Sequence, residues 1–65
     1  MQEYDRVKVV KDTERYKKAG IYKGMIGTIL DPRKIEGRWL VVFSDENGND
    51  IAEDSILEED LEVVK

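Results

Sequence analysis

Short blocks of apolar residues, separated by polar segments, recur along the whole chain. Polar and apolar side chains alternate around Val7 and Val9, which is typical of a half-buried strand. The block RWLVVFS is the richest in β-branched and aromatic residues, and Pro32 ends the block before it. The pattern predicts five short strands, near residues 5–11, 25–31, 38–44, 50–54 and 61–64.

The segments between these blocks have signals of their own. Residues 12–24 lack a strand pattern and predict a long loop with one helical turn near residues 14–19. Asn47-Gly48 between two strand-like blocks predicts a hairpin. Ser55 with Glu58 three residues later matches a capping box, which predicts a helical turn beginning at Ser55.

This order of elements resembles an SH3-like barrel. Lys23–Ile29, with the sequence KGMIGTI, resembles the KGxxGxV core of KOW-type barrels. Ser55–Val64, with the sequence SILEEDLEVV, resembles the ending of photosystem I accessory subunits and other electron-transport accessory domains. The resemblance implies one all-β domain over residues 1–65, a five-stranded barrel with a long first loop and a helical turn before the last strand.

The resemblance to signalling SH3 domains is only partial. Those domains have an ALYDY motif near the first loop, and a proline and a tyrosine in the helical turn. Here EYDR stands at residues 3–6, and residues 55–60 contain neither proline nor tyrosine. The walls of a polyproline groove are therefore missing from the sequence.

Composition narrows the chemistry that the chain can perform. The chain has no histidine and no cysteine, which removes the usual general base, the most reactive nucleophile and the preferred zinc ligands. We expect no catalysis, no metal and no cofactor. The absence of cysteine fits a cytoplasmic protein, and no apolar run reaches the ~20 residues of a membrane helix.

Charge is distributed unevenly. The net charge is −4, with ten basic and six acidic residues in residues 1–38 but one basic and nine acidic residues in residues 39–65. Such halves either attract each other within one fold or make the molecule a dipole.

Two surfaces are candidates for binding. The first is a basic loop with interleaved tyrosines, which suits nucleic acid unless the tyrosines pack against the core. Its residues are Lys11, Arg15, Tyr16, Lys17, Lys18, Tyr22 and Lys23.

The second surface follows from strand alternation. Trp39, Val41 and Phe43 share one face of their strand, and Leu40 and Val42 share the other. A bulge at Gly27 would put Ile26 and Ile29 in the core and turn Leu30 outward. The predicted outer apolar interface is Val10, Leu30, Leu40 and Val42. Such a cluster meets a partner, unless strand bending buries both faces.

We therefore expect a small, non-catalytic protein-interaction or accessory module. Its partner would be another protein or a second copy of the chain, without a membrane. RNA binding of the KOW type through residues 11–23 is the alternative.

Overall fold

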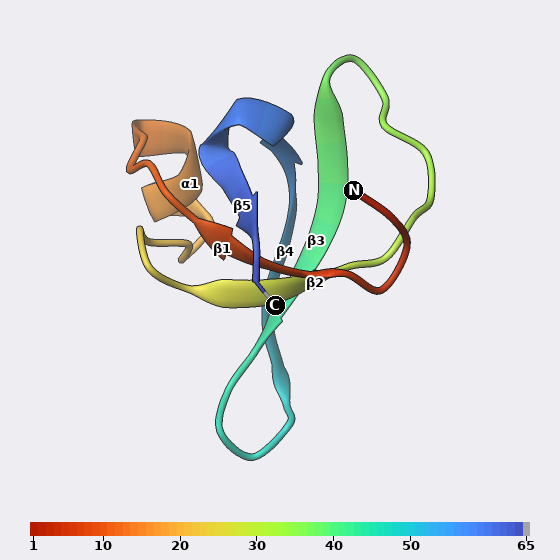
Figure 1. Ribbon diagram of the computed structural model, residues 1–65. Helices are drawn as coiled ribbons and strands as arrows, with labels where there is room; N and C mark the ends of the chain where they lie inside the picture. The colour runs from red at the N-terminus through yellow and green to blue at the C-terminus, as the bar shows by residue number, and fades with distance from the viewer. Residues whose placement is uncertain (65) are drawn as a thin grey trace.

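The computed structural model describes residues 1–64 and contains five antiparallel strands in one sheet (Figure 1). The strands are β1 (Arg6–Val9), β2 (Ile26–Ile29), β3 (Arg38–Ser44), β4 (Asp50–Leu57) and β5 (Leu61–Val63). The helical segments are α1 (Glu14–Lys18), in the long first loop, and the 3-10 turn η1 (Glu58–Asp60), just before β5. The predicted all-β class, the five strands and the helical turn before the last strand are confirmed.

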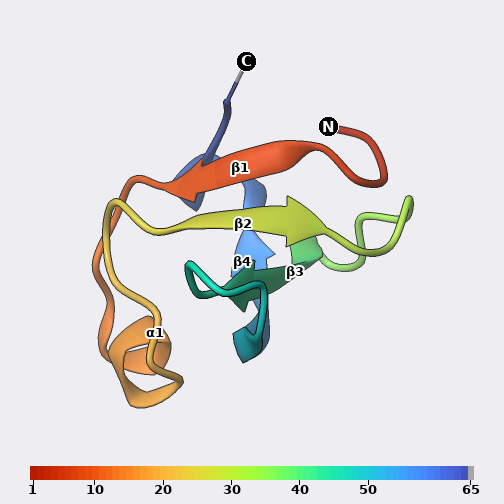
Figure 2. The same cartoon turned by 90° about the horizontal axis from the view of Figure 1, so that it is seen from below.

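The sheet is strongly twisted. Its strand order is β4-β3-β2-β1-β5, and β1 and β2 cross β3 and β4 at a steep angle, as the two perpendicular views together show (Figure 1 and Figure 2). The turn η1 carries the chain directly from one edge strand, β4, to the other, β5. Within residues 1–64 no residue of β4 pairs with β5, so closure into a barrel stays a prediction.

The fourth strand is longer than its sequence pattern indicates. It continues to Leu57 because β3 offers a partner for each added residue, including Leu40 for Ser55. Ser55 is therefore a strand residue, and the predicted capping box is wrong. The N-cap of η1 is Leu57, whose side chain makes no capping bond. Pairing with the long strand β3 keeps Ser55 in β4, so its side chain does not cap a helical turn.

The core lies on the inner face of the sheet. Trp39, Val41 and Phe43 are buried, whereas Leu40 and Val42 are half-buried on the opposite face, as alternation predicted. The remaining buried apolar side chains come from the other four strands and from the first loop: Val7, Val9, Tyr16, Ile21, Ile29, Ile56 and Leu61.

Gly27 makes a close contact rather than a bulge. Strand β2 pairs with β3 without a register shift, with Gly27 opposite Phe43. A Cβ atom on Gly27 would lie 2.8 Å from Phe43 Cδ1, so only glycine fits this inward position. The predicted bulge is wrong, and Ile26 is 41% exposed instead of sharing the core.

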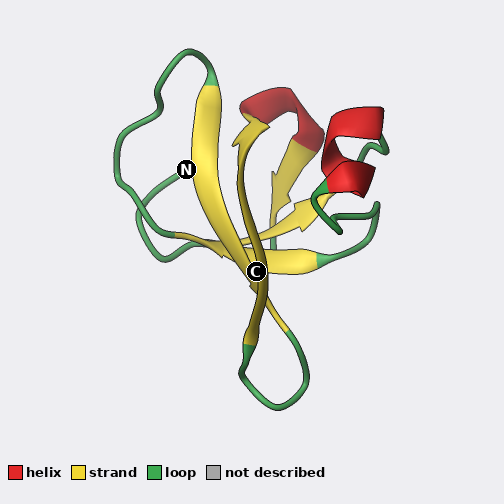
Figure 3. Cartoon of the chain, turned by 180° about the vertical axis from the view of Figure 1, so that it is seen from behind, coloured by secondary structure: helices red, strands yellow, loops and turns green. Residues whose placement is uncertain are grey.

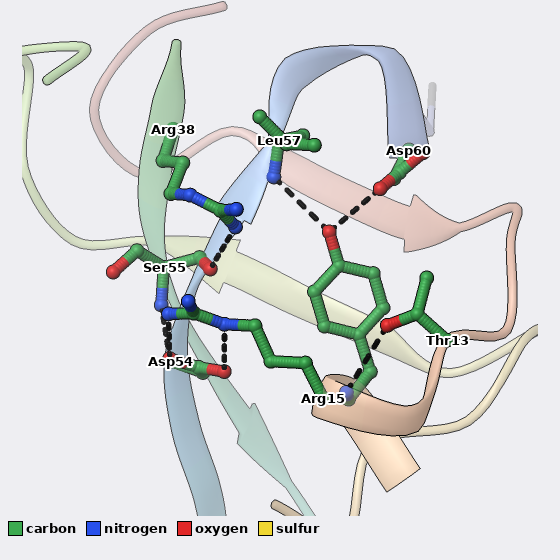
Figure 4. Close-up of polar contacts among 8 residues, drawn as sticks. Thr13, Arg15, Arg38, Asp54, Ser55, Leu57 and Asp60 are labelled. Carbon is green, nitrogen blue, oxygen red and sulfur yellow. Dashed lines mark hydrogen bonds and ion pairs between the residues drawn. The ribbon is translucent and has the colours of Figure 1, made fainter. Parts of the chain in front are cut away.

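Helix α1 lies beside η1 at one end of the sheet (Figure 3). Thr13 begins the helix, and its Oγ1 accepts the Tyr16 amide at 3.2 Å. The Tyr16 hydroxyl donates to Asp60 Oδ2 at 2.6 Å and accepts the Leu57 amide at 3.3 Å (Figure 4). These bonds join α1 to the end of β4 and to η1.

Candidate interaction surfaces

Tyr16 is not available for binding. Its side chain is 1% exposed, and its hydroxyl is bonded within the fold. Burial is the first cause that raises the pKa of Tyr16, and the hydrogen bond to Asp60 is the second. The prediction that Tyr16 belongs to an accessible binding loop is wrong, because its ring completes a thin core.

Arg15 is also engaged within the fold, in an ion pair with Asp54. Its guanidinium makes two hydrogen bonds to the carboxylate of Asp54, from Nη2 at 3.2 Å and from Nε at 3.4 Å (Figure 4). Asp54 is partly buried on β4, and its Oδ1 also accepts the Ser55 amide at 2.8 Å. This ion pair joins the basic first loop to the acidic second half of the chain.

The rest of the basic loop is exposed. Asp12 Oδ1 accepts the Lys23 amide at 2.7 Å, which brings the two arms of the loop together. Tyr22 is 52% exposed, unlike Tyr16. All four lysines of this loop are exposed and form no ion pair within residues 1–64: Lys11, Lys17, Lys18 and Lys23.

The predicted apolar interface is only partly assembled. The Leu30 amide donates to the Leu40 carbonyl at 2.9 Å, so these residues are neighbours on the outer face. Val10 lies at the other end of the β1–β2 ladder. The residue before it, Val9, accepts a hydrogen bond from the Gly24 amide, so Val10 is next to Gly24 and not to Leu30. Gly24 and Leu30 are six residues apart, or about 20 Å along an extended chain. The prediction is therefore wrong for Val10.

Two hollows flank the remaining apolar residues. The first, the loop hollow, has a volume of about 300 Å³ and is lined by Leu40, Arg38, Ser55 and the loop before β3. The second, the hairpin hollow, has a volume of about 270 Å³ and is lined by Val42, by residues of β1 and β2, and by the turn after β3. Leu40 and Val42 thus connect two concavities on one face.

The loop before β3 is a fixed wall of the loop hollow. Ile35 and Arg38 exchange two backbone hydrogen bonds, of 2.9 and 3.0 Å, around a tight turn. Gly37 and Glu36 both have positive φ, and a non-glycine residue there is uncommon. Lys34 Nζ lies 2.6 Å from Glu58 Oε2, which attaches the wall to η1 and lowers the pKa of Glu58.

The charges around the loop hollow are not all matched. Arg33 makes two side-chain bonds to Asp31, both 3.1 Å, and these are the main reason that the pKa of Asp31 is lowered. Arg38, by contrast, is half-buried and donates from Nη1 to the Ser55 carbonyl at 3.3 Å (Figure 4). It forms no ion pair within residues 1–64.

Sequence reasoning missed Arg38 and Ile35. Alternation alone would have found Arg38, because it is two residues before Leu40 and four before Val42 on the same face. Ile35 had no comparable signal, because its place in the wall depends on the turn that precedes β3.

Neither a cluster of metal-ligating side chains nor a membrane-spanning helix occurs among the described residues. Residues 1–64 contain no group of three or more acidic, histidine or cysteine side chains that could hold a metal ion. No helix within them is long and apolar enough to cross a membrane.

No protein family, curated protein or solved structure matches this chain. Its function must therefore be argued from its own geometry.

Proposed function

We propose that this domain is a non-catalytic protein-interaction module that binds an extended segment of a partner protein on the outer face of β3. The observation that carries the proposal is the position of Leu40 and Val42. Both are half-buried on the outer face, and each lines one of two adjacent hollows. An apolar strip between concavities suits a bound chain, because its side chains can enter the hollows while its backbone crosses the strip.

An extended segment suits this face better than a second copy of the domain. The accessible surface of the domain is 4421 Å², so an interface of standard size would occupy about a fifth of it, which is much more than the strip of Leu40 and Val42. A stable interface between two folded proteins buries about 800 Å² on each partner. A short peptide needs less area, since it can cover the strip alone and place side chains in the two hollows beside it.

The architecture supports an SH3-like barrel as the fold family. Five antiparallel strands, a long first loop and a single 3-10 turn between the two edge strands match that arrangement. This fold hosts many unrelated activities, so it does not by itself favour one ligand.

RNA binding through the first loop is the weaker alternative. It is supported by the four exposed lysines of that loop and by Tyr22. Two residues that it needs are not free to bind: the ring of Tyr16 is buried in the core, and Arg15 is paired with Asp54. The net charge of −4 further opposes binding to a polyanion.

The test is a selection from a random peptide library, followed by titration of the enriched peptides against the isotope-labelled domain. The amide resonances that shift should belong to β3 and to the walls of the two hollows. Leu40→Glu should weaken binding at least about tenfold, because it places a charge in the apolar strip.

Ile51→Glu is the matched control, because Ile51 is 55% exposed and lines neither hollow. It should bind the peptides as the wild type does, and thermal melting should show that both variants are folded. The proposal is wrong if no peptide is enriched, if the shifts lie on the first loop, or if the two variants bind equally. Titration with single- and double-stranded RNA at low salt, where electrostatic attraction is strongest, tests the alternative.

A further inference from the structure

The outer face of β3 presents three side chains in a regular row. Arg38, Leu40 and Val42 alternate with Trp39 and Val41, which are buried on the inner face. Side chains two residues apart on a strand are separated by about 7 Å. An extended peptide has the same spacing, so its alternate side chains can meet the three members of the row one by one.

Arg38 is the member of the row with unused binding capacity. A guanidinium has five N–H donors, and within residues 1–64 the Arg38 side chain makes one hydrogen bond, to the Ser55 carbonyl. The two neighbouring arginines differ, since Arg15 is bonded to Asp54 and Arg33 to Asp31. Because Arg38 is half-buried beside Leu40, water screens its charge less than it screens the charge of an exposed lysine.

We infer that the outer face of β3 selects a partner segment with an acidic residue, which pairs with Arg38, and apolar residues two and four positions away, which lie on Leu40 and Val42. This inference rests on the proposed function and names the chemistry of its ligand. A carboxylate suits the site because it can accept two parallel hydrogen bonds from a guanidinium. Val42 also lines the hairpin hollow, which receives the far end of the segment.

Glu36 opposes the acidic ligand. Glu36 lies in the tight turn between Ile35 and Arg38 and lines the loop hollow, and it forms no ion pair within residues 1–64. Its negative charge repels a carboxylate that approaches Arg38. Glu36→Gln should therefore tighten binding of an acidic peptide and leave binding of a neutral peptide unchanged.

Synthetic heptapeptides test the inference. The probe is Thr-Glu-Thr-Leu-Thr-Val-Thr with blocked ends, and the same residues in reverse order cover the opposite chain direction. In the comparison peptides, lysine replaces glutamate. In at least one direction, the glutamate peptide should bind the wild-type domain about five- to tenfold more tightly than its lysine counterpart. This preference should decrease as salt is added.

Arg38→Gln should abolish the preference between glutamate and lysine peptides. Lys8→Gln is the matched control, because Lys8 is an exposed cation of β1 that lines neither hollow, and it should keep the preference. The inference is overturned if wild type binds both peptides equally, if none of the four peptides binds, or if Arg38→Gln still discriminates. Such a result leaves the proposed function standing when library peptides still shift the β3 amides, and removes it when they do not.

Discussion

Replacing Tyr16 with phenylalanine removes one oxygen atom from the buried contact between α1, η1 and the end of β4. The hydroxyl donates to Asp60 at 2.6 Å and accepts the Leu57 amide at 3.3 Å. Asp60 is 2% exposed, and its carboxylate has no other side-chain partner within residues 1–64. In Tyr16→Phe, the buried Asp60 carboxylate therefore loses its side-chain hydrogen-bond donor.

The expected cost is large for so small a domain. A hydrogen bond to a charged group contributes about 1.5–3 kcal/mol, and loss of its partner leaves the buried group's desolvation uncompensated. We expect the free energy of unfolding to fall by about 2–3 kcal/mol. A domain of this length has a total stability of about 3–10 kcal/mol, so this change is a substantial fraction of it.

Urea denaturation followed by Trp39 fluorescence measures the change, because Trp39 is buried in the core. The midpoint should fall by about 2–3 M if the slope is near 1 kcal/mol/M. Tyr22→Phe is the matched control, because it removes the same atom from a ring that is 52% exposed, and it should stay within about 0.5 kcal/mol of wild type. A Tyr16→Phe variant as stable as the control would refute the reasoning.

The same variant has a signature in pH. The pKa of Tyr16 is raised above its ordinary value of 10.0, first by burial and then by the bond to Asp60. Its contribution to stability is thus complete below about pH 10 and is lost as pH rises through the folded-state pKa. The stability difference between wild type and Tyr16→Phe should narrow above pH 10, and a constant difference would contradict this origin of the shift.

Two further substitutions test the local geometry by the same denaturation assay. Gly27→Ala would place a Cβ atom 2.7 Å from the Val42 carbonyl oxygen and 2.8 Å from Phe43, so we expect a loss of about 1–3 kcal/mol from overpacking, and an unchanged midpoint would show that β2 can move away from β3. Thr13→Ala removes the hydroxyl that accepts the Tyr16 amide and should cost about 1 kcal/mol, whereas Thr13→Ser keeps the cap and should cost less.

Predictions from local sequence succeeded where neighbouring residues decide the structure. The alternation around Val41 put Leu40 and Val42 on the face opposite the core, because successive side chains of a strand point to opposite sides. The hairpin at Asn47-Gly48 joins β3 to β4, and Gly48 has the positive φ that such a turn requires. Both features need only a few adjacent residues.

Predictions failed where a distant residue competes with a local preference. The sequence marked Ser55 as a helix cap, but the ladder with β3 extends β4 past it. Val10 shares the apolar character of Leu30, yet the register of β1 against β2 separates them. Register depends on how the strands pair, and a single strand does not contain that information.

Tyr16 shows most clearly the difference between what neighbouring residues and what distant residues determine. Its sequence neighbours, two lysines and an arginine, are those of an exposed basic loop. Its burial depends on Asp60, 44 residues away, whose carboxylate accepts a hydrogen bond from the hydroxyl where α1 meets η1. The sequence by itself determined the strands, their alternation and the apolar strip on β3. Only the tertiary structure decided which basic-loop residues are exposed, and that Arg38 lies beside the strip without an ion-pair partner within residues 1–64, because burial and ion pairing depend on contacts between residues far apart in the chain.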